Sequence, residues 1–265
     1  MSTSGWSAFA ARQSRLSGFL FVLLLLAGWE IVTYLVEDVA FYIPAVSSML
    51  QAFGEMTWSG ELPYHTVVTL IRLLLGFALS LVAAIPCGLL IGHSRPLFEV
   101  SEPLVELLRP VPAIAIMPIA ILVLGINVRM QVFVIAWASF WPILLNALDG
   151  VRGIDPILMD TARTYGYQRF GLFRRIVLFS ALPYIMAGLR LSLTISLILA
   201  IFVEIFMGGS GLGFLIVDYR SALRIPEMYA AIIMVAVLGY LLNAAFVLLE
   251  GRLIRWHHMS HASAG

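Results

Sequence analysis

The sequence predicts an all-α membrane protein that crosses the bilayer about six times. Of its 265 residues, 61% are hydrophobic and only 12% are charged, and the mean hydropathy is +0.98. Soluble domains carry about 25% charged residues, so a soluble fold could not cover this much apolar surface. The composition therefore excludes an ordinary soluble domain and favours a polytopic membrane protein.

Six apolar segments have roughly the 20 residues that a helix needs to cross a bilayer. The first follows Arg12 and Arg15, but it is too long for a signal peptide and no small-residue cleavage site follows it, so we expect an uncleaved anchor. The expected spans are 16–36, 66–92, 103–126, 130–148, 181–207 and 228–249. They make up a membrane domain of residues 16–256, between tails at 1–15 and 257–265.

The third span is rich in proline. Pro110, Pro112 and Pro118 each remove a backbone donor and disturb a helix. Two interpretations stay open: a helix break at the membrane edge, or an irregular helix that lines a cavity.

The placement of arginine predicts the orientation, because cytoplasmic loops carry an excess of basic residues. The loop at 37–65 has no arginine and four acidic residues, whereas arginines are frequent between the fourth and fifth spans. We therefore expect both termini and residues 155–183 in the cytoplasm. Three histidines in the C-terminal tail lack acidic or cysteine partners, and Cys87 is the only cysteine, so we expect no metal site. We also expect no nucleic-acid partner.

Residues 155–183 form the one long arginine-rich amphipathic segment. Asp155 and Pro156 are a strong helix start, because Asp caps free amides and proline is favoured at the first helical position. Gly166 is a good helix stop. These signals predict a helix of about ten residues, roughly 15 Å long. A second helix is expected from Gln168 into the fifth span.

Leu158, Ala162 and Tyr165 are spaced to form one small apolar face on the first of these helices. Two interpretations remain: an interfacial helix lying on lipid, or a docking helix for a cytoplasmic partner. Asp160 slightly disfavours the lipid interpretation, because an acid gains nothing from anionic headgroups.

This segment resembles the signature loop of ABC importer permeases, which reads EAA, three residues, Gly, nine residues, Ile, one residue, Leu-Pro. Asp160, Thr161 and Ala162 stand at the EAA positions, Gly166 has the required spacing, and Ile176 follows after nine intervening residues. Phe179 stands where the motif has proline, and Leu182-Pro183 supplies a second leucine-proline pair. Further likeness at 106–126, 188–192 and 204–213 matches best the nitrate, sulfonate and taurine branch.

The resemblance implies the type I ABC importer permease fold in a bacterial inner membrane. Two permease copies, as a homodimer or a pseudo-symmetric pair, would contact two cytoplasmic ATPase subunits. A periplasmic binding protein would deliver a small anion such as a sulfonate, taurine or nitrate. The sequence has no Gly-rich phosphate loop, so ATP and Mg²⁺ would bind to the ATPase and this chain would bind no cofactor. The expected ATPase-coupling residues are Leu158, Asp160, Thr161, Ala162, Tyr165, Gly166 and Ile176.

Polar residues inside the predicted spans are candidates for the solute pathway, since such residues are costly in lipid. Arg72 could pair, reach the headgroups or line the pathway, and Glu204 could belong to an outer gate. Small polar residues on the fourth and fifth spans could line the pathway or join helices, and the glycines after the fifth span could form a flexible turn or a gate. The candidates are Arg72, Ser139, Asn146, Ser192, Ser196, Glu204, Gly211 and Gly213.

Two other functional classes compete with the permease. A stand-alone secondary transporter or channel often has inverted repeats, and mirrored halves are not apparent in this sequence. An intramembrane enzyme would need a nucleophile with a base or a metal cluster, and neither a G-x-S-x-G nor an H-E-x-x-H motif occurs.

Overall fold

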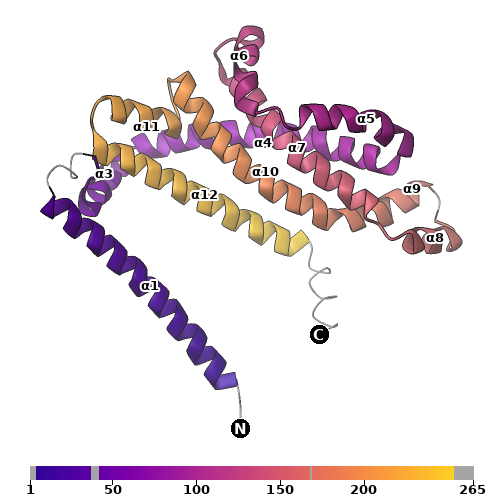
Figure 1. The fold of residues 1–265 in the computed structure, drawn as a ribbon, viewed down its shortest axis with the longest axis horizontal. Coiled ribbons are helices and arrows are strands. Elements are labelled where there is room, and N and C mark those ends of the chain that lie inside the picture. The colour runs from indigo at the N-terminus through magenta and orange to yellow at the C-terminus, as the bar shows by residue number, and fades with distance from the viewer. Residues whose placement is uncertain (1–3, 37–41, 168, 254–265) are drawn as a thin grey trace. The chain divides into compact units, whose positions relative to one another are not determined.

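A computed structural model describes residues 4–36, 42–167 and 169–253, without the side chains of 4–16, 19, 163, 169 and 170. Every regular element in these ranges is a helix (Figure 1). The chain divides into two compact units. The smaller consists of Met1–Pro63 and Leu215–Met234, and the larger of Tyr64–Phe214 and Val235–Gly265.

The helices follow one another with short connections. In chain order they are α1 (Ser4–Leu35), α3 (Val46–Trp58), α4 (Glu61–His93), α5 (Arg95–Leu108), α6 (Ala113–Leu124), α7 (Val128–Arg152), α8 (Pro156–Thr164), α9 (Arg169–Leu172), the π-helix η1 (Phe173–Val177), α10 (Leu178–Met207), α11 (Leu212–Ser221) and α12 (Ile225–Leu253).

The prediction of an all-helical, multi-spanning chain is confirmed. Among the described residues, four helices are long and apolar enough to cross a membrane: α4, α7, the continuous helix Phe173–Met207 and α12. The apolar part of α1, Leu20–Leu35, is shorter and corresponds to the predicted first span. These segments and the bent pair α5–α6 account for the six predicted ones.

The third predicted span is two helices rather than one. α5 and α6 meet at an angle of 93° across residues 109–112. Pro110 and Pro112 cause this break, because proline donates no backbone hydrogen bond and disfavours helical geometry at the residue before it. Pro118 lies inside α6 without ending it.

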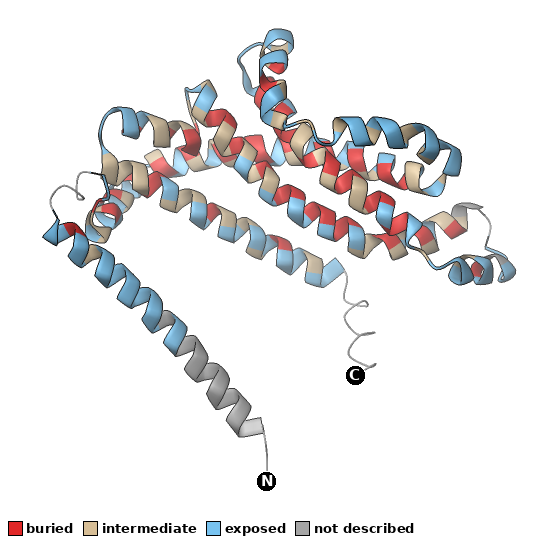
Figure 2. Ribbon diagram, viewed as in Figure 1, coloured by how far each residue is buried: buried red, intermediate tan, exposed pale blue. Residues whose placement is uncertain are grey.

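The core of the larger unit is formed by α7 packed along α10. Figure 2 shows buried residues along both helices. Glycines allow the backbones to approach closely. A Cβ on Gly188 would lie 2.8 Å from Asn146 Cβ, and one on Gly88 of α4 would lie 2.6 Å from the Leu144 carbonyl oxygen. Small residues at such interfaces are typical of membrane helices, where dispersion contacts replace the hydrophobic effect.

The smaller unit contains a helix that the sequence pattern did not predict. Residues 37–65 were expected to form a loop, but α3 occupies much of that range. Its buried residues Met49, Ala52 and Met56 share one face, and at 13 residues it is too short for a span. The start of α3 is held to α1, since Ser47 donates to Glu30 at 2.6 Å and Trp29 donates to the Pro44 carbonyl oxygen at 3.1 Å.

We expect Gly188→Ala to lower the stability of the purified protein by about 1–3 kcal/mol, because an added methyl group overpacks the α7–α10 contact. Gly54→Ala in α3 is the matched control, since a Cβ there meets no atom within 4 Å. Unfolding midpoints in detergent measure both variants. Equal unfolding midpoints for Gly188→Ala and Gly54→Ala would show that α7 and α10 do not pack closely at Gly188.

Candidate functional site

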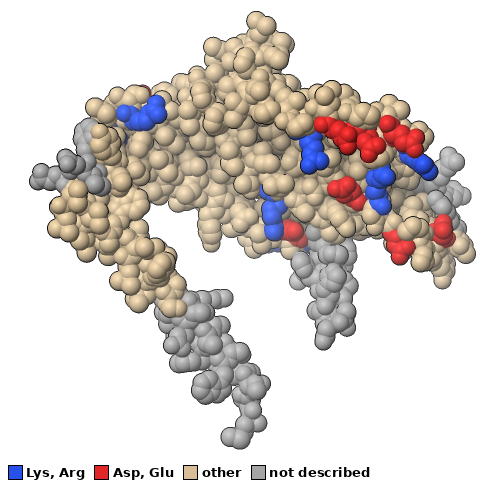
Figure 3. All heavy atoms as spheres, in the orientation of Figure 1, with Lys and Arg blue, Asp and Glu red and all other residues tan. Residues whose placement is uncertain are grey.

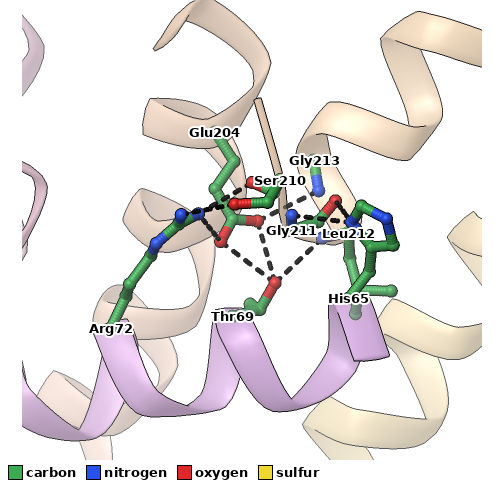
Figure 4. A network of polar contacts seen from close by, with 8 residues as sticks. All are labelled: His65, Thr69, Arg72, Glu204, Ser210, Gly211, Leu212 and Gly213. Atoms are coloured by element: carbon green, nitrogen blue, oxygen red, sulfur yellow. Dashed lines mark hydrogen bonds and ion pairs between the residues drawn. The ribbon is translucent and has the colours of Figure 1, made fainter. Parts of the chain in front are cut away.

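Three buried polar side chains lie along one face of α4. His65, Thr69 and Arg72 are spaced by four and three residues, so they lie in a row along the helix. All three are buried. They point toward Glu204 near the end of α10 and toward the segment that follows it, as Figure 4 shows. Of these four side chains, only Arg72 and Glu204 were predicted as candidates. The regular spacing of His65 and Thr69 with Arg72 is the signal that could have identified the other two.

Glu204 is 1% exposed, so its carboxylate depends on protein partners. Arg72 Nη1 donates to Glu204 Oε1 at 3.0 Å, and the Thr69 hydroxyl lies 3.0 and 2.9 Å from the two carboxylate oxygens. The Gly213 amide donates to Oε2 at 3.1 Å. The carboxylate is thus held by a guanidinium, a hydroxyl and a backbone amide, a well-partnered form of buried charge.

The segment 208–213, which we call the glycine loop, is fixed by the same side chains. Arg72 donates to the Ser210 carbonyl oxygen and hydroxyl, both at 2.7 Å. The Leu212 amide donates to Thr69 at 2.9 Å, and the Gly211 amide donates to His65 Nδ1 at 2.8 Å. The expected flexible turn is therefore a loop anchored on α4.

Glycine is required at two positions of this loop. Gly211 has φ +107°, and a Cβ there would overlap the Glu204 carboxylate. A Cβ on Gly213 would overlap the carbonyl oxygen of Ile201. Both predicted glycines thus lie directly against the buried acid or its helix.

The predicted serine candidates lie elsewhere, between α7 and α10. Ser139, Ser192 and Ser196 are fully buried. The hydroxyls of Ser139 and Ser196 are 2.6 Å apart, and Ser192 donates to the Ser139 carbonyl oxygen at 2.8 Å. This placement favours helix packing over contact with a solute, and a pathway role for the serines stays a prediction. Asn146, by contrast, is half-buried at the wall of a hollow.

The predicted helix after Asp155 is present as α8. Asp155 Oδ1 accepts from the Ile157 amide at 2.8 Å, which caps the helix as expected. The helix ends just before Gly166, whose φ of +78° suits glycine alone. Both end signals in the sequence are confirmed.

The apolar side chains of this segment are mostly exposed. Ala162 is 5% exposed, but Leu158 is 44%, Ile157 73% and Tyr165 80% exposed. Tyr165 lies beyond the last residue of α8, so the expected face of three residues is not a single buried stripe. Figure 3 shows that, on the visible face, charged side chains gather over the end of the larger unit that carries α5 and α8.

The second predicted helix continues without interruption into the fifth span. It begins at Arg169 as α9, passes through η1 and becomes α10. Ile176 lies in η1 and is half-buried, and the chain stays helical through Phe179, where the family motif has proline. Gln168, together with the side chains of Arg163 and Arg169, lies outside the described residues.

A smaller polar cluster belongs to the smaller unit. The Tyr219 hydroxyl donates to Glu61 at 2.6 Å, and Arg224 lies over the Tyr219 ring while pairing with Glu227 at 2.7 Å. Burial raises the pKa of the Tyr219 phenol, and the nearby Glu61 carboxylate raises it further. Among the described side chains, His, Cys, Asp and Glu form no group of three that could hold a metal ion.

We expect Gly211→Ala to destabilise the protein far more than Gly209→Ala. Both glycines have positive φ, +107° and +94°, so each variant carries the backbone strain of about 1–2 kcal/mol. Only at Gly211 does the new Cβ displace the Glu204 carboxylate, and a disrupted buried ion pair costs about 3–5 kcal/mol. Thermal unfolding in detergent compares the two, and an equal loss would contradict the buried network.

Known proteins resemble this chain over most of its length. It is 31% identical to a Bacillus subtilis protein named as an aliphatic sulfonates transport permease, covering 93% of this chain and 90% of the relative. A similarly named Escherichia coli protein is 32% identical, with 83% of each chain covered. The taurine transport system permease of Escherichia coli is 27% identical over 95% of this chain and 93% of its own length.

The fold also matches a solved structure. The inward-facing MetNI methionine ABC transporter superposes with a TM-score of 0.60 at 18% identity, over 68% of this chain and 90% of that one. The family model described as binding-protein-dependent transport system inner membrane component matches residues 84–255. The predicted resemblance to ABC importer permeases is confirmed, and the chain belongs to the family of inner-membrane permease components of binding-protein-dependent transport systems.

Proposed function

We propose that this permease imports a small anion, such as a sulfonate, taurine or nitrate, in an ATP-driven transporter. The support is the likeness to relatives named for sulfonate, taurine and nitrate transport. In this proposal the chain lies in the inner membrane with both termini in the cytoplasm, as the arginine distribution predicts. The end with α8 then faces the cytoplasm, and the glycine loop lies toward the periplasm.

We further propose that two copies of the chain work with two ATPase subunits and a periplasmic binding protein. The observation that carries this proposal is the exposure of Ile157, Leu158 and Tyr165 on or beside a short, capped helix. Exposed apolar side chains rimmed by polar residues are typical of a protein interaction site. Asp160, Thr161 and Gly166, with Ile176 in η1, would place this surface in a groove of the ATPase, where ATP and Mg²⁺ bind.

The continuous helix that follows α8 would carry the movement into the membrane. A displacement of α8 passes to α9, η1 and α10, which form one unbroken helical path to Met207. α10 is packed closely on α7, and Glu204 near its far end is bound to α4 and the glycine loop. Docking at one end can therefore shift the opposite end, the arrangement that alternating access requires.

Gly166→Pro should abolish ATP-dependent uptake while leaving membrane insertion intact, because proline cannot adopt φ +78°. Gly166→Ala should weaken uptake through about 1–2 kcal/mol of backbone strain alone, since no atom lies within 4 Å of its Cβ. Gly171→Ala, with an ordinary contact at 3.5 Å, is the control. Uptake and ATPase rates in proteoliposomes measure the effect, and normal uptake by Gly166→Pro would refute the docking role.

Asp160→Arg should reduce recovery of the ATPase subunit with the purified permease, because it reverses a charge at the proposed contact. Asp218→Arg makes the same change on an exposed residue of α11 and should leave recovery unchanged. Equal recovery from both variants would remove Asp160 from the contact. Solute uptake by the permease without an ATPase or ATP would instead support a stand-alone transporter.

A further inference from the structure

The break between α5 and α6 leaves the non-helical residues 109–112 at the surface of the larger unit. Arg109, Pro110 and Pro112 are all exposed or half-buried in this chain. Irregular backbone at membrane depth is tolerated only where protein covers it or where it lines a water-filled cavity. The depth of the break in the membrane and the residues around it therefore indicate whether it is covered by protein or lines a water-filled cavity.

A hollow beside the break fixes that depth. Arg109 shares its wall with Trp141 of α7 and Leu191 of α10. Trp141 and Leu191 are close to the midpoints of Val128–Arg152 and Leu178–Met207. The hollow has a volume of about 540 Å³, enough for a small solute with several waters. It extends from the middle of these two helices to Asp149, in the last turn of α7.

Arg109 has no ion-pair partner among the described residues, in contrast to Arg72, which Glu204 neutralises. An unpaired guanidinium at this depth is costly in lipid, so it needs water or an anion. A guanidinium also presents paired donors that suit the oxygens of an anionic group.

Two further polar residues, Asn146 and Asp149, line the same hollow. Asn146 donates to the Pro142 carbonyl oxygen at 2.8 Å, which holds its amide in place at the wall. Asp149 is exposed there and reduces the positive potential around Arg109. A transport path needs contacts that are favourable enough for entry and weak enough for release. The Asp149 carboxylate beside Arg109 weakens the attraction for an anion and so allows its release.

We infer that this hollow is a water-filled section of the solute pathway. In it Arg109 makes a transient contact with the anionic group of the solute, a sulfonate or another small oxyanion, and Asp149 keeps that contact weak. The inference rests on the proposed import of a small anion. It assigns contact with the solute to Arg109. Arg72 cannot make this contact, because its guanidinium is buried and paired with Glu204.

Cysteine modification tests the environment of Arg109 in membrane vesicles. In a Cys87→Ser background, Asn146→Cys is treated with 2-sulfonatoethyl methanethiosulfonate, itself a small sulfonate, or with its trimethylammonium analogue. Both should react, whereas Val82→Cys on the exposed apolar side of α4 should not. Ala138→Cys is a second position at the hollow, should Asn146→Cys not fold.

Adding Arg109→Gln should lower the ratio of the anionic to the cationic rate about tenfold, because the loss of one charge roughly 6 Å away in water changes each rate about threefold and in opposite directions. Arg95→Gln, which removes an exposed cation paired with Glu99, should leave the ratio unchanged. Failure of both reagents to react at both hollow positions would show that the hollow is dry. An unchanged ratio with Arg109→Gln would show that Arg109 does not act on an anion there. Each result would overturn the inference.

Uptake by the complete transporter tests the solute contact itself. Arg109→Gln should raise KM severalfold, whereas Asp149→Asn should lower both KM and kcat because release becomes slower. Unchanged values for both variants would overturn the pathway role. If the wild-type transporter imports no sulfonate, taurine or nitrate, the proposed function fails and the solute contact fails with it. The reagent ratio would still decide whether the hollow attracts anions.

Discussion

A single buried carboxylate imposes the strictest constraint on this molecule. Glu204 is almost inaccessible, and water cannot replace any partner that it loses. Its partners come from three places: the α4 side chains Arg72 and Thr69, the Gly213 amide and, through Arg72, the Ser210 backbone. The first half of α4, the end of α10 and the glycine loop must therefore keep one arrangement or exchange it for another as a unit.

The rest of the larger unit follows from close helix contact. α7 and α10 meet through glycine and serine, where dispersion and hydrogen bonds provide the stability that the hydrophobic effect provides in water. Such packing holds α10 against α7 along the continuous helix that leads from α9 and η1 to the Glu204 network. The α5–α6 break is the contrasting feature, since its backbone and Arg109 are left open beside a hollow. A permease that alternates access needs helices that move as rigid units, as α7 and α10 would, and polar groups open to water, as at the α5–α6 break.

The sequence predicted the long apolar helices and the limits of α8 well, because hydropathy, Asp155 and Gly166 are strong local signals. It did not predict α3 or α11, which are too short to stand out as spans. Contacts between distant residues were also missed. Thr69 and Glu204 are 135 residues apart, and Arg190 pairs with Glu250. Spacing identifies polar residues on one helix, but only the packing of helices decides which polar groups meet.

We expect Arg72 and Glu204 to stabilise the fold as a pair. A double-mutant cycle with Arg72→Gln, Glu204→Gln and the combined variant, measured by reversible unfolding in mixed micelles, tests it most directly. A coupled pair should give a coupling energy of about 2 kcal/mol or more, in the upper part of the range for groups in one network. Losses that add to within about 0.5 kcal/mol would contradict it, because independent sites behave that way.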